Sequence, residues 1–292
     1  MKSDRPYFQY RSLSRNLVVF SSLLLLSSCT SLVSSFVIKP TISNLQKQTD
    51  LQLACDGGPS YLLMIDSLIS SKPDDPSLLQ VGAEAYSSYL GTLAECGAKQ
   101  GRLKAIASKA RLYGTTILAQ QLPIGSGDSL EQLDIALKNV TVDQVDSFFW
   151  AGAAWTSWVL QQHGSPSAMI ELVKIEKIML RLAELDESFA NGSIHLILGS
   201  YYGAKPELIG GKPELAKKYF ERGLNLSKRL YLPLQTAYAQ TYCRMTMNQE
   251  LHDQLLEEVI AFPLDQSPDF ALANQVAKSK ARKLLEEKFF EE

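Results

Sequence analysis

The residues that could bind a metal ion or attack a substrate are scattered along this 292-residue sequence. His163, His195 and His252 fall on different predicted helices, and none belongs to an HxxxH or HExxH motif. A GxSxG motif is absent, and the paired carboxylates have no nucleophile near them in sequence. These pairs are Asp143/Asp146, Asp186/Glu187 and Glu257/Glu258. We therefore expect no metal site, no cofactor and no enzymatic activity.

One cysteine has a distinctive context. The segment Leu26-Ser27-Ser28-Cys29 resembles the lipobox of bacterial lipoproteins, in which the cysteine thiol takes a diacylglycerol. Before it, residues 1–16 carry four basic groups and an apolar run follows from Leu17 to Ser28, which is the layout of a secretory signal. The run is shorter than the roughly 20 residues that span a bilayer. We predict a signal peptide over residues 1–28 and lipidation of Cys29; an ordinary signal with a coincidental cysteine is the alternative.

The predicted export bears on the remaining cysteines. By resemblance to Gram-negative sorting rules, Thr30 after the lipidated residue favours the periplasmic face of the outer membrane. An exported chain meets oxidising conditions, in which disulfides persist. Cys55 lies just before one predicted helix and Cys96 ends the next, so an antiparallel hairpin would bring them together. We predict a disulfide between Cys55 and Cys96, and a buried thiol at Cys243.

An aromatic cluster over residues 148–158 is the strongest candidate for a binding surface. On a helix, Phe148, Trp155 and Trp158 share a broad face while Trp150 points elsewhere, so at least one ring should leave the core. A second aromatic pair precedes the turn Gly210-Gly211, which lacks the frame of a phosphate loop. Packing in the core is the alternative for all of these rings. The candidate groove residues, for a ligand or a partner, are Phe149, Trp150, Trp155, Tyr201 and Tyr202.

The elements that position these residues are helices throughout. Apolar residues recur at spacings of three and four, and turn signals such as Lys72-Pro73-Asp74-Asp75-Pro76 separate the segments. Residues 29–50 form the lipidated terminus and a tether without helical periodicity, and residues 51–292 form one domain. The predicted helices span residues 58–71, 76–96, 101–121, 129–139, 143–163, 166–187, 191–204, 212–227, 232–247, 249–261 and 268–289.

Short turns between these helices favour antiparallel neighbours, and the small residues recur in a repeat-like pattern. His195 and Gly199 in one helix, followed by Ala216 and Phe220 in the next, match the spacing of a tetratricopeptide repeat, with a longer loop between. Small residues let such helices approach, and large ones fill the gaps between them. We predict an all-α fold of antiparallel hairpins stacked as a degenerate tetratricopeptide-like solenoid or bundle of about 11 helices. An irregular helical bundle is the alternative.

Two segments carry a family resemblance: TVDQVDSFFWAGAAWTSWV over residues 141–159, and the stretch from His195 to Ser227. Both are similar to the T component associated with TRAP transporters, a family of periplasmic lipoproteins with cryptic tetratricopeptide repeats. The resemblance implies a helical scaffold that forms small oligomers, engages the solute-binding protein of a TRAP system, and holds a hydrophobic ligand in a pore or groove. Cys55 and Cys96 depart from what we associate with the family.

Composition and charge limit the classes of partner that we expect. Residues 1–28 hold four of the 29 basic residues and one of the 31 acidic ones, so their removal leaves a net charge of −5. Without a basic stripe, nucleic acid is excluded as an expected partner. We expect a lipid-anchored accessory protein that binds a periplasmic solute-binding protein, forms homo-oligomers, and touches the membrane only through its lipid. A stand-alone carrier of a small hydrophobic ligand, or an outer-membrane assembly adaptor, is the alternative.

Overall fold

The structure is a computed structural model that describes residues 39–122, 129–205 and 210–291. The chain divides into two compact units, residues 1–44 and 45–292, and the fold discussed below is that of the second. The described residues contain helices and turns and no strand, so the predicted all-α fold class is confirmed for this part of the chain. The predicted lipidation site, Cys29, and the predicted signal peptide over residues 1–28 lie outside the described residues.

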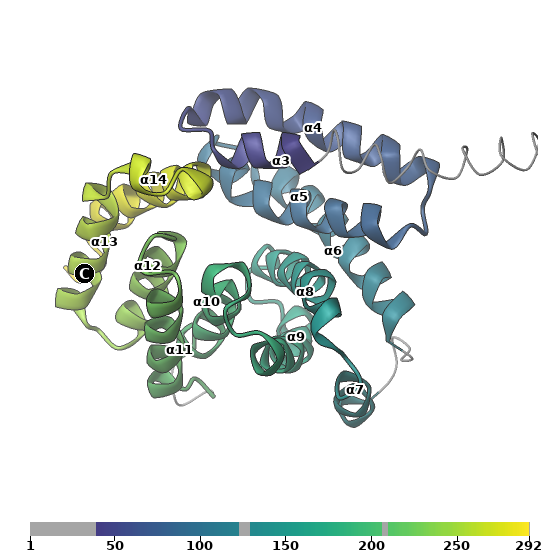
Figure 1. Cartoon of the computed structure of the whole chain (residues 1–292). Coiled ribbons are helices and arrows are strands. Elements are labelled where there is room, and N and C mark those ends of the chain that lie inside the picture. The colour runs from purple at the N-terminus through teal and green to yellow at the C-terminus, as the bar shows by residue number, and fades with distance from the viewer. Residues whose placement is uncertain (1–38, 123–128, 206–209, 292) are drawn as a thin grey trace, which may run out of the picture. The chain divides into compact units, whose positions relative to one another are not determined.

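Twelve α-helices are described, and Figure 1 shows the longer ones arranged in chain order. Three short 3-10 turns, at Val142–Gln144, Leu264–Gln266 and Pro268–Phe270, and a π-helical turn at Ala239–Cys243 join or extend them. The α-helices are α3 (Lys39–Gln46), α4 (Leu51–Ser71), α5 (Pro76–Glu95), α6 (Gln100–Gln121), α7 (Leu130–Leu137), α8 (Val145–Leu160), α9 (Pro166–Leu185), α10 (Phe189–Gly203), α11 (Pro213–Leu226), α12 (Pro233–Tyr238), α13 (Gln249–Ala261) and α14 (Ala271–Glu286).

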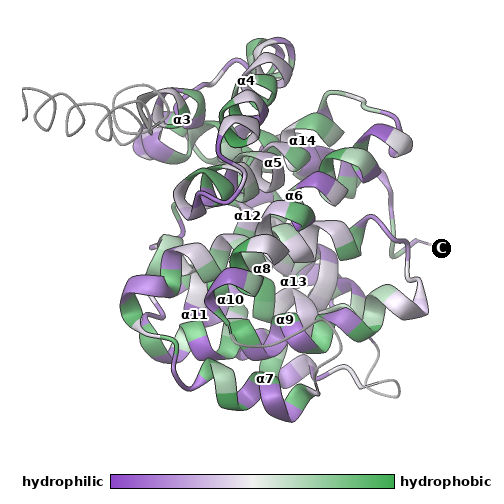
Figure 2. Ribbon diagram, turned by 90° about the vertical axis from the view of Figure 1, so that its right-hand side faces the viewer, coloured by the Kyte–Doolittle hydropathy of each residue, from purple (hydrophilic) through white to green (hydrophobic). Residues whose placement is uncertain are grey.

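Helices that follow one another in the chain pack together, as short connections require. Pairs such as α5 with α6, α8 with α9 and α10 with α11 are in contact, and α6 also packs against α8. Figure 2 shows polar and apolar residues around the same helices, which is what helices buried on one side need. The last helix then returns to the first ones of the unit: α14 contacts α5, where Glu95 accepts hydrogen bonds from Ser279 and Lys283.

Close approach of the helices depends on glycines at the seams. A Cβ atom on Gly199 in α10 would lie 2.9 Å from the ring of Phe220 in α11. A Cβ atom on Gly114 in α6 would lie 2.9 Å from the backbone of Ala151 in α8. Distances of that kind are overlaps, so a larger side chain at either position would force the helices apart.

Helix α4 corrects the sequence analysis, which starts this helix at residue 58 and treats Asp56-Gly57-Gly58-Pro59 as a break. The helix begins at Leu51, where the Asp50 carboxylate accepts a hydrogen bond from the Leu53 amide, and it continues through Pro59. Proline has no N–H to donate to the carbonyl four residues earlier, that of Cys55. The Tyr89 hydroxyl from α5 donates to that carbonyl instead, at 3.1 Å, and its ring occupies the space beside Gly58.

Helix α3 is a second correction, because Lys39–Gln46 is helical where the sequence analysis expects a tether without helical structure. Eight residues make only about two turns, too few for an apolar period to stand out. Pro40 is compatible with this helix because the first turn needs no N–H donor at that position.

Candidate functional site

An open pocket of about 760 Å³ lies among helices α6, α7, α8 and α9. Its size is within the range of small-molecule sites, which run from about 300 to 1,000 Å³. Helix α8 contributes two tryptophans, with α6 and α9 supplying most of the remaining wall. The lining residues are Ser108, Arg111, Leu112, Thr115, Thr116, Leu118, Ala119, Leu122, Ser129, Leu133, Trp155, Trp158, Glu171, Lys174 and Ile178.

Two glycines, Gly114 on α6 and Gly152 on α8, allow the helices that form the pocket walls to pack closely. Gly114 lets α6 approach the backbone of Ala151 in α8, and Gly152 leaves room for the Met179 side chain of α9. Helices α6 and α9 therefore both pack on α8, and the pocket opens where their side chains face one another. An ion pair between Lys177 of α9 and Asp134 of α7 fixes the fourth helix.

Charged side chains lie on the otherwise mostly apolar wall of the pocket. The Arg111 guanidinium stacks on the Trp158 ring at 3.8 Å from the ring centroid and lies 5.8 Å from that of Trp155. Such cation–π contacts favour a flat, weakly hydrated cation. Its ionic partner is Glu171, with the Nη2 and Oε2 atoms 3.9 Å apart, which is too long for a hydrogen bond. Lys174 also lines the pocket and has no ion pair within the described residues.

Trp155 is the more buried of the two tryptophans in the pocket wall. Its side chain is 8% exposed, and its indole N–H has no hydrogen-bond partner among the described residues. A buried donor without a partner costs free energy, so native proteins contain few of them. The indole N–H is covered by neighbouring atoms, and the ring itself forms part of the pocket surface.

Of the five candidate groove residues, Trp155 lines this pocket and the other four lie elsewhere. Phe149 is buried against Phe189, and Trp150 packs edge-on against Phe149 at the margin of the core. Tyr202 is buried and donates a hydrogen bond to Glu176, while its ring stacks on Tyr219. Burial raises the pKa of the Tyr201 hydroxyl to about 12.

Of the four residues predicted to pack the repeat, Gly199 and Phe220 contact one another across the α10–α11 interface. Ala216 and Phe220 are fully buried on α11, and Phe220 fills the space beside Gly199 and stacks on Tyr238 at 4.7 Å. His195 is buried on α10, with neither ring nitrogen hydrogen-bonded within the described residues. Burial lowers the pKa of His195, so the imidazole is held in its neutral form.

The two cysteines of the first hairpin, Cys55 and Cys96, form a disulfide in the structure, with Cα atoms 5.8 Å apart. It joins α4 to the end of α5 and closes a loop with a sequence separation of 41 residues. A loop of that length corresponds to a stabilisation of about 3 to 4 kcal/mol through the unfolded state. Cys243 is a free, fully buried thiol, and burial raises its pKa to about 12.

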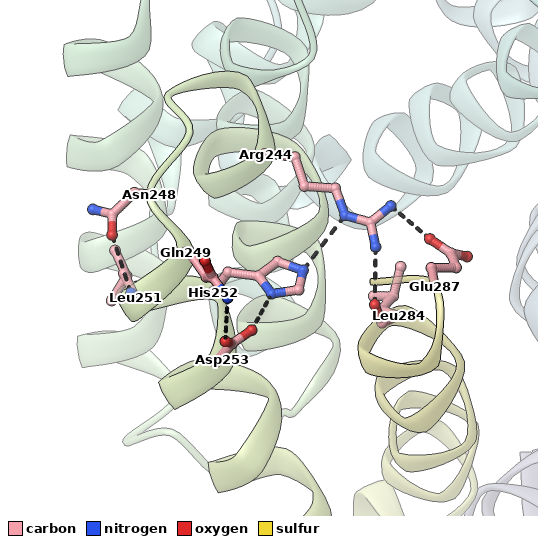
Figure 3. A network of polar contacts seen from close by, with 8 residues as sticks. All are labelled: Arg244, Asn248, Gln249, Leu251, His252, Asp253, Leu284 and Glu287. Atoms are coloured by element: carbon pink, nitrogen blue, oxygen red, sulfur yellow. Dashed lines mark hydrogen bonds and ion pairs between the residues drawn. The ribbon is translucent and has the colours of Figure 1, made fainter. Parts of the chain in front are cut away.

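A polar network joins the two C-terminal helices, and Figure 3 shows it between α13 and α14. Arg244 donates to the Leu284 carbonyl at 3.2 Å and pairs with Glu287 at 2.7 Å. It also donates to the Nε2 atom of the buried His252 at 3.4 Å, so the other ring nitrogen, Nδ1, carries the proton given to Asp253 at 2.8 Å. Arg244 and His252 are paired within the chain, while the carboxylates of Glu287 and Asp253 at the edge of the network are partly exposed to solvent.

Sequence reasoning missed Arg111, Glu171 and Lys174. A signal for them exists: Ser108, Arg111, Thr115, Ala119 and Leu122 follow one another at spacings of three and four along one side of α6. The side is polar at one end and apolar at the other, so it resembles a solvated helix face until α9 is placed opposite.

Other kinds of site are not found in the part of the chain that the structure covers. Among residues 39–122, 129–205 and 210–291, no three histidine, cysteine or acidic side chains gather as metal ligands would. Over the same ranges, every helix is too short or too polar to cross a membrane.

The described residues form a strand-free series of packed helices with a pocket in its side, which is the architecture of helical scaffolds whose grooves between helices can hold ligands or partners. The particular family follows from comparison with known proteins. Residues 47–290 match the TRAP transporter T-component family, and the chain belongs to that family. Its members are accessory components of TRAP transport. An uncharacterized protein of Treponema pallidum (strain Nichols) is 22% identical over 256 residues, which cover 81% of this chain and 78% of the relative.

Proposed function

We propose that this protein is a lipid-anchored periplasmic accessory component that binds the solute-binding protein of a TRAP-type transport system. The observation that carries the proposal is the family match, which spans nearly all of the second compact unit. The signal-like segment before Cys29 supports export and anchoring.

The distribution of exposed apolar side chains supports a partner surface on α6–α9. Large apolar side chains that remain exposed gather in this part of the described chain more than on α10–α13. Contiguous exposed apolar surface marks sites of association, whereas single exposed apolar residues are normal, so the variants below test whether these residues act together. The residues concerned are Leu112, Leu130, Ile135, Val142, Leu160 and Ile170.

Affinity purification of the full chain from its native membrane tests the partner. We expect a TRAP solute-binding protein to co-purify. The double variant Ile135→Glu/Ile170→Glu should lose it, because two charges would be buried in the interface. Leu63→Glu is the matched control, since Leu63 is equally exposed but lies on α4. Recovery of the same partner by the double variant would reject the assigned surface, and failure to recover a solute-binding protein with the wild-type chain would reject the function.

The lipid anchor has its own test. Cys29→Ser removes the only atom to which the diacylglycerol could attach at the predicted site. We expect the wild-type chain to partition into the detergent phase and the variant to stay in the aqueous phase, because acyl chains contribute about 0.8 kcal/mol per buried CH₂ to anchoring. Equal partitioning of the two chains would show that Cys29 carries no lipid.

A second candidate function is carriage of a small ligand, and the pocket at Trp155 favours it. The pocket is open, its wall is mostly apolar, and its volume suits a small molecule. Carriage and partner binding are compatible, because a ligand held beside the α6–α9 surface would lie close to a bound solute-binding protein.

A further inference from the structure

The pocket among α6–α9 offers a small set of charges, and their balance is informative. Arg111 and Lys174 are cationic and Glu171 is anionic, so the wall carries one net positive charge. The rest of its polar lining consists of hydroxyl groups from serine and threonine. Lys174 has neither a hydrogen bond nor an ion pair within the described residues, so its charge is free to meet a ligand.

The Arg111 guanidinium is held against Trp158, but its hydrogen-bond donors are not used by any described side chain. Stacking on Trp158 holds the guanidinium plane, while the N–H groups at its edge make no hydrogen bond to any side chain of the described residues. The guanidinium edge matches a carboxylate, which accepts two parallel hydrogen bonds from it. Glu171, at 3.9 Å, is close enough to orient the cation and too far to occupy its donors.

Apolar side chains make up the remainder of the wall. Leu118 of α6, Leu133 of α7 and Ile178 of α9 come from three different helices and face the same space. A ligand that fills the pocket would therefore meet cations on one part of its surface and aliphatic groups on another.

We propose that this pocket binds an amphiphile with a single carboxylate, whose head group meets Arg111 and Lys174 and whose apolar body packs against Leu118, Leu133 and Ile178. The inference rests on ligand carriage, the second candidate function above. A neutral head group would leave the Lys174 charge without a partner, and a cationic one would be repelled. A second carboxylate is disfavoured because only one net positive charge is present and Glu171 would repel it.

Tryptophan fluorescence provides a direct measurement, because the chain has three tryptophans and all three lie on α8. Four probes share a ten-carbon chain: decanoate, decanol, decyltrimethylammonium and decanedioate. Decanoate should bind at least about fivefold more tightly than decanol, which is the scale of a partly exposed ion pair. Decyltrimethylammonium and decanedioate should bind more weakly than decanoate.

Three variants locate the head group. Lys174→Gln should weaken decanoate by about fivefold and leave decanol unchanged. Arg111→Lys keeps the charge but loses the stacked, two-pronged geometry, so it should weaken decanoate with decanol again unchanged. Lys104→Gln is the control, because Lys104 lies on α6 outside the pocket. Thermal unfolding of each variant, measured in parallel, separates loss of binding from loss of folding.

The outcomes separate the claims. Equal affinity for decanoate and decanol, or equal effects of the pocket variants on both, would overturn the carboxylate assignment and leave carriage of neutral ligands standing. Binding of none of the four probes would overturn carriage in this pocket as well. Either result leaves the partner proposal intact if the solute-binding protein still co-purifies, since that measurement requires no ligand.

Discussion

Trp155 and Asn274 are both almost completely buried, one in the pocket-bearing helices α6–α9 and the other in the C-terminal helices α10–α14. The Asn274 side chain is paired on every side: it accepts from the Leu232 amide at 2.9 Å and donates to the Leu230 carbonyl and the Ser267 hydroxyl. The Trp155 N–H has no partner among the described residues, and its ring forms a pocket wall.

The two regions therefore differ in what their buried polar groups do. In the C-terminal helices, paired groups such as Asn274 and Arg244 fix how one segment lies against another, so they act on stability. In α6–α9, Arg111, Lys174 and the face of the Trp155 ring line the open pocket, so they are placed to act on a ligand that enters it. His195 shows that lack of a hydrogen bond is not enough by itself, because neither of its ring nitrogens is hydrogen-bonded within the described residues and it does not line the pocket among α6–α9.

The largest expected effect is in the C-terminal helices α10–α14, where the buried polar groups are hydrogen-bonded. Asn274→Leu keeps a similar volume but leaves the Leu232 amide and the Leu230 carbonyl without partners in the core. We expect unfolding to become easier by about 3 kcal/mol, the sum of two or more unsatisfied groups. Urea denaturation measures this, with Asn225→Ala, an exposed position on α11, as the control. A loss below about 1 kcal/mol would mean that the network is not what stabilises these helices.

The next prediction tests whether the packing of α6 against α8, the two helices beside the pocket, is as tight as the packing of the C-terminal helices. Gly114→Ala would place a methyl group 2.9 Å from the Ala151 backbone, which cannot rotate away as a side chain could. We expect a loss of about 2 kcal/mol from overpacking, together with weaker binding in the pocket. Gly101→Ala on the same helix meets no atom within 4 Å and should stabilise the protein by about 0.5 kcal/mol. Similar changes in the two variants would show that α6 can move away from α8 at little cost.

Removal of Arg244 should cost less, because part of its surroundings reaches solvent. Arg244→Met loses the bonds to Leu284, Glu287 and His252 while keeping most of the apolar stem. We expect about 1.5 kcal/mol of destabilisation, with hydrogen exchange rising first at the end of α14. Protection that falls equally along α10–α14 would show that the network supports all of these helices and not only their last turns.

The helices themselves could be predicted from the sequence, because the apolar spacing of three and four residues and the proline and glycine turns are local signals. The seam at Gly199 and Phe220 could also be anticipated, since a repeat pattern encodes which residue meets which. The start of α4 could not, because Pro59 is a local signal for a break and its effect is offset by Tyr89, which is distant in sequence.

The pocket was only partly within reach of sequence reasoning. Trp155 could be named because aromatic rings are conspicuous, but Tyr201 and Tyr202 are equally conspicuous and lie outside the pocket. Arg111 and Lys174 acquire their role only when α6 and α9 face each other across α8, 63 residues apart in the case of these two cations. Helix periodicity gives the face on which a residue lies, and it does not give the element opposite.

The smallest expected effect is the sharpest test of the comparison. Trp155→Phe keeps an aromatic ring in the wall and removes an N–H that bonds to nothing in the described chain. No hydrogen bond is lost and one unsatisfied donor disappears, so the free energy of unfolding should change by less than about 1 kcal/mol. Chemical denaturation beside Asn274→Leu measures the contrast directly. A loss as large as that of Asn274→Leu would show that the indole N–H is paired in solution, and the distinction between a structural region and a ligand-facing region would then fail at its central residue.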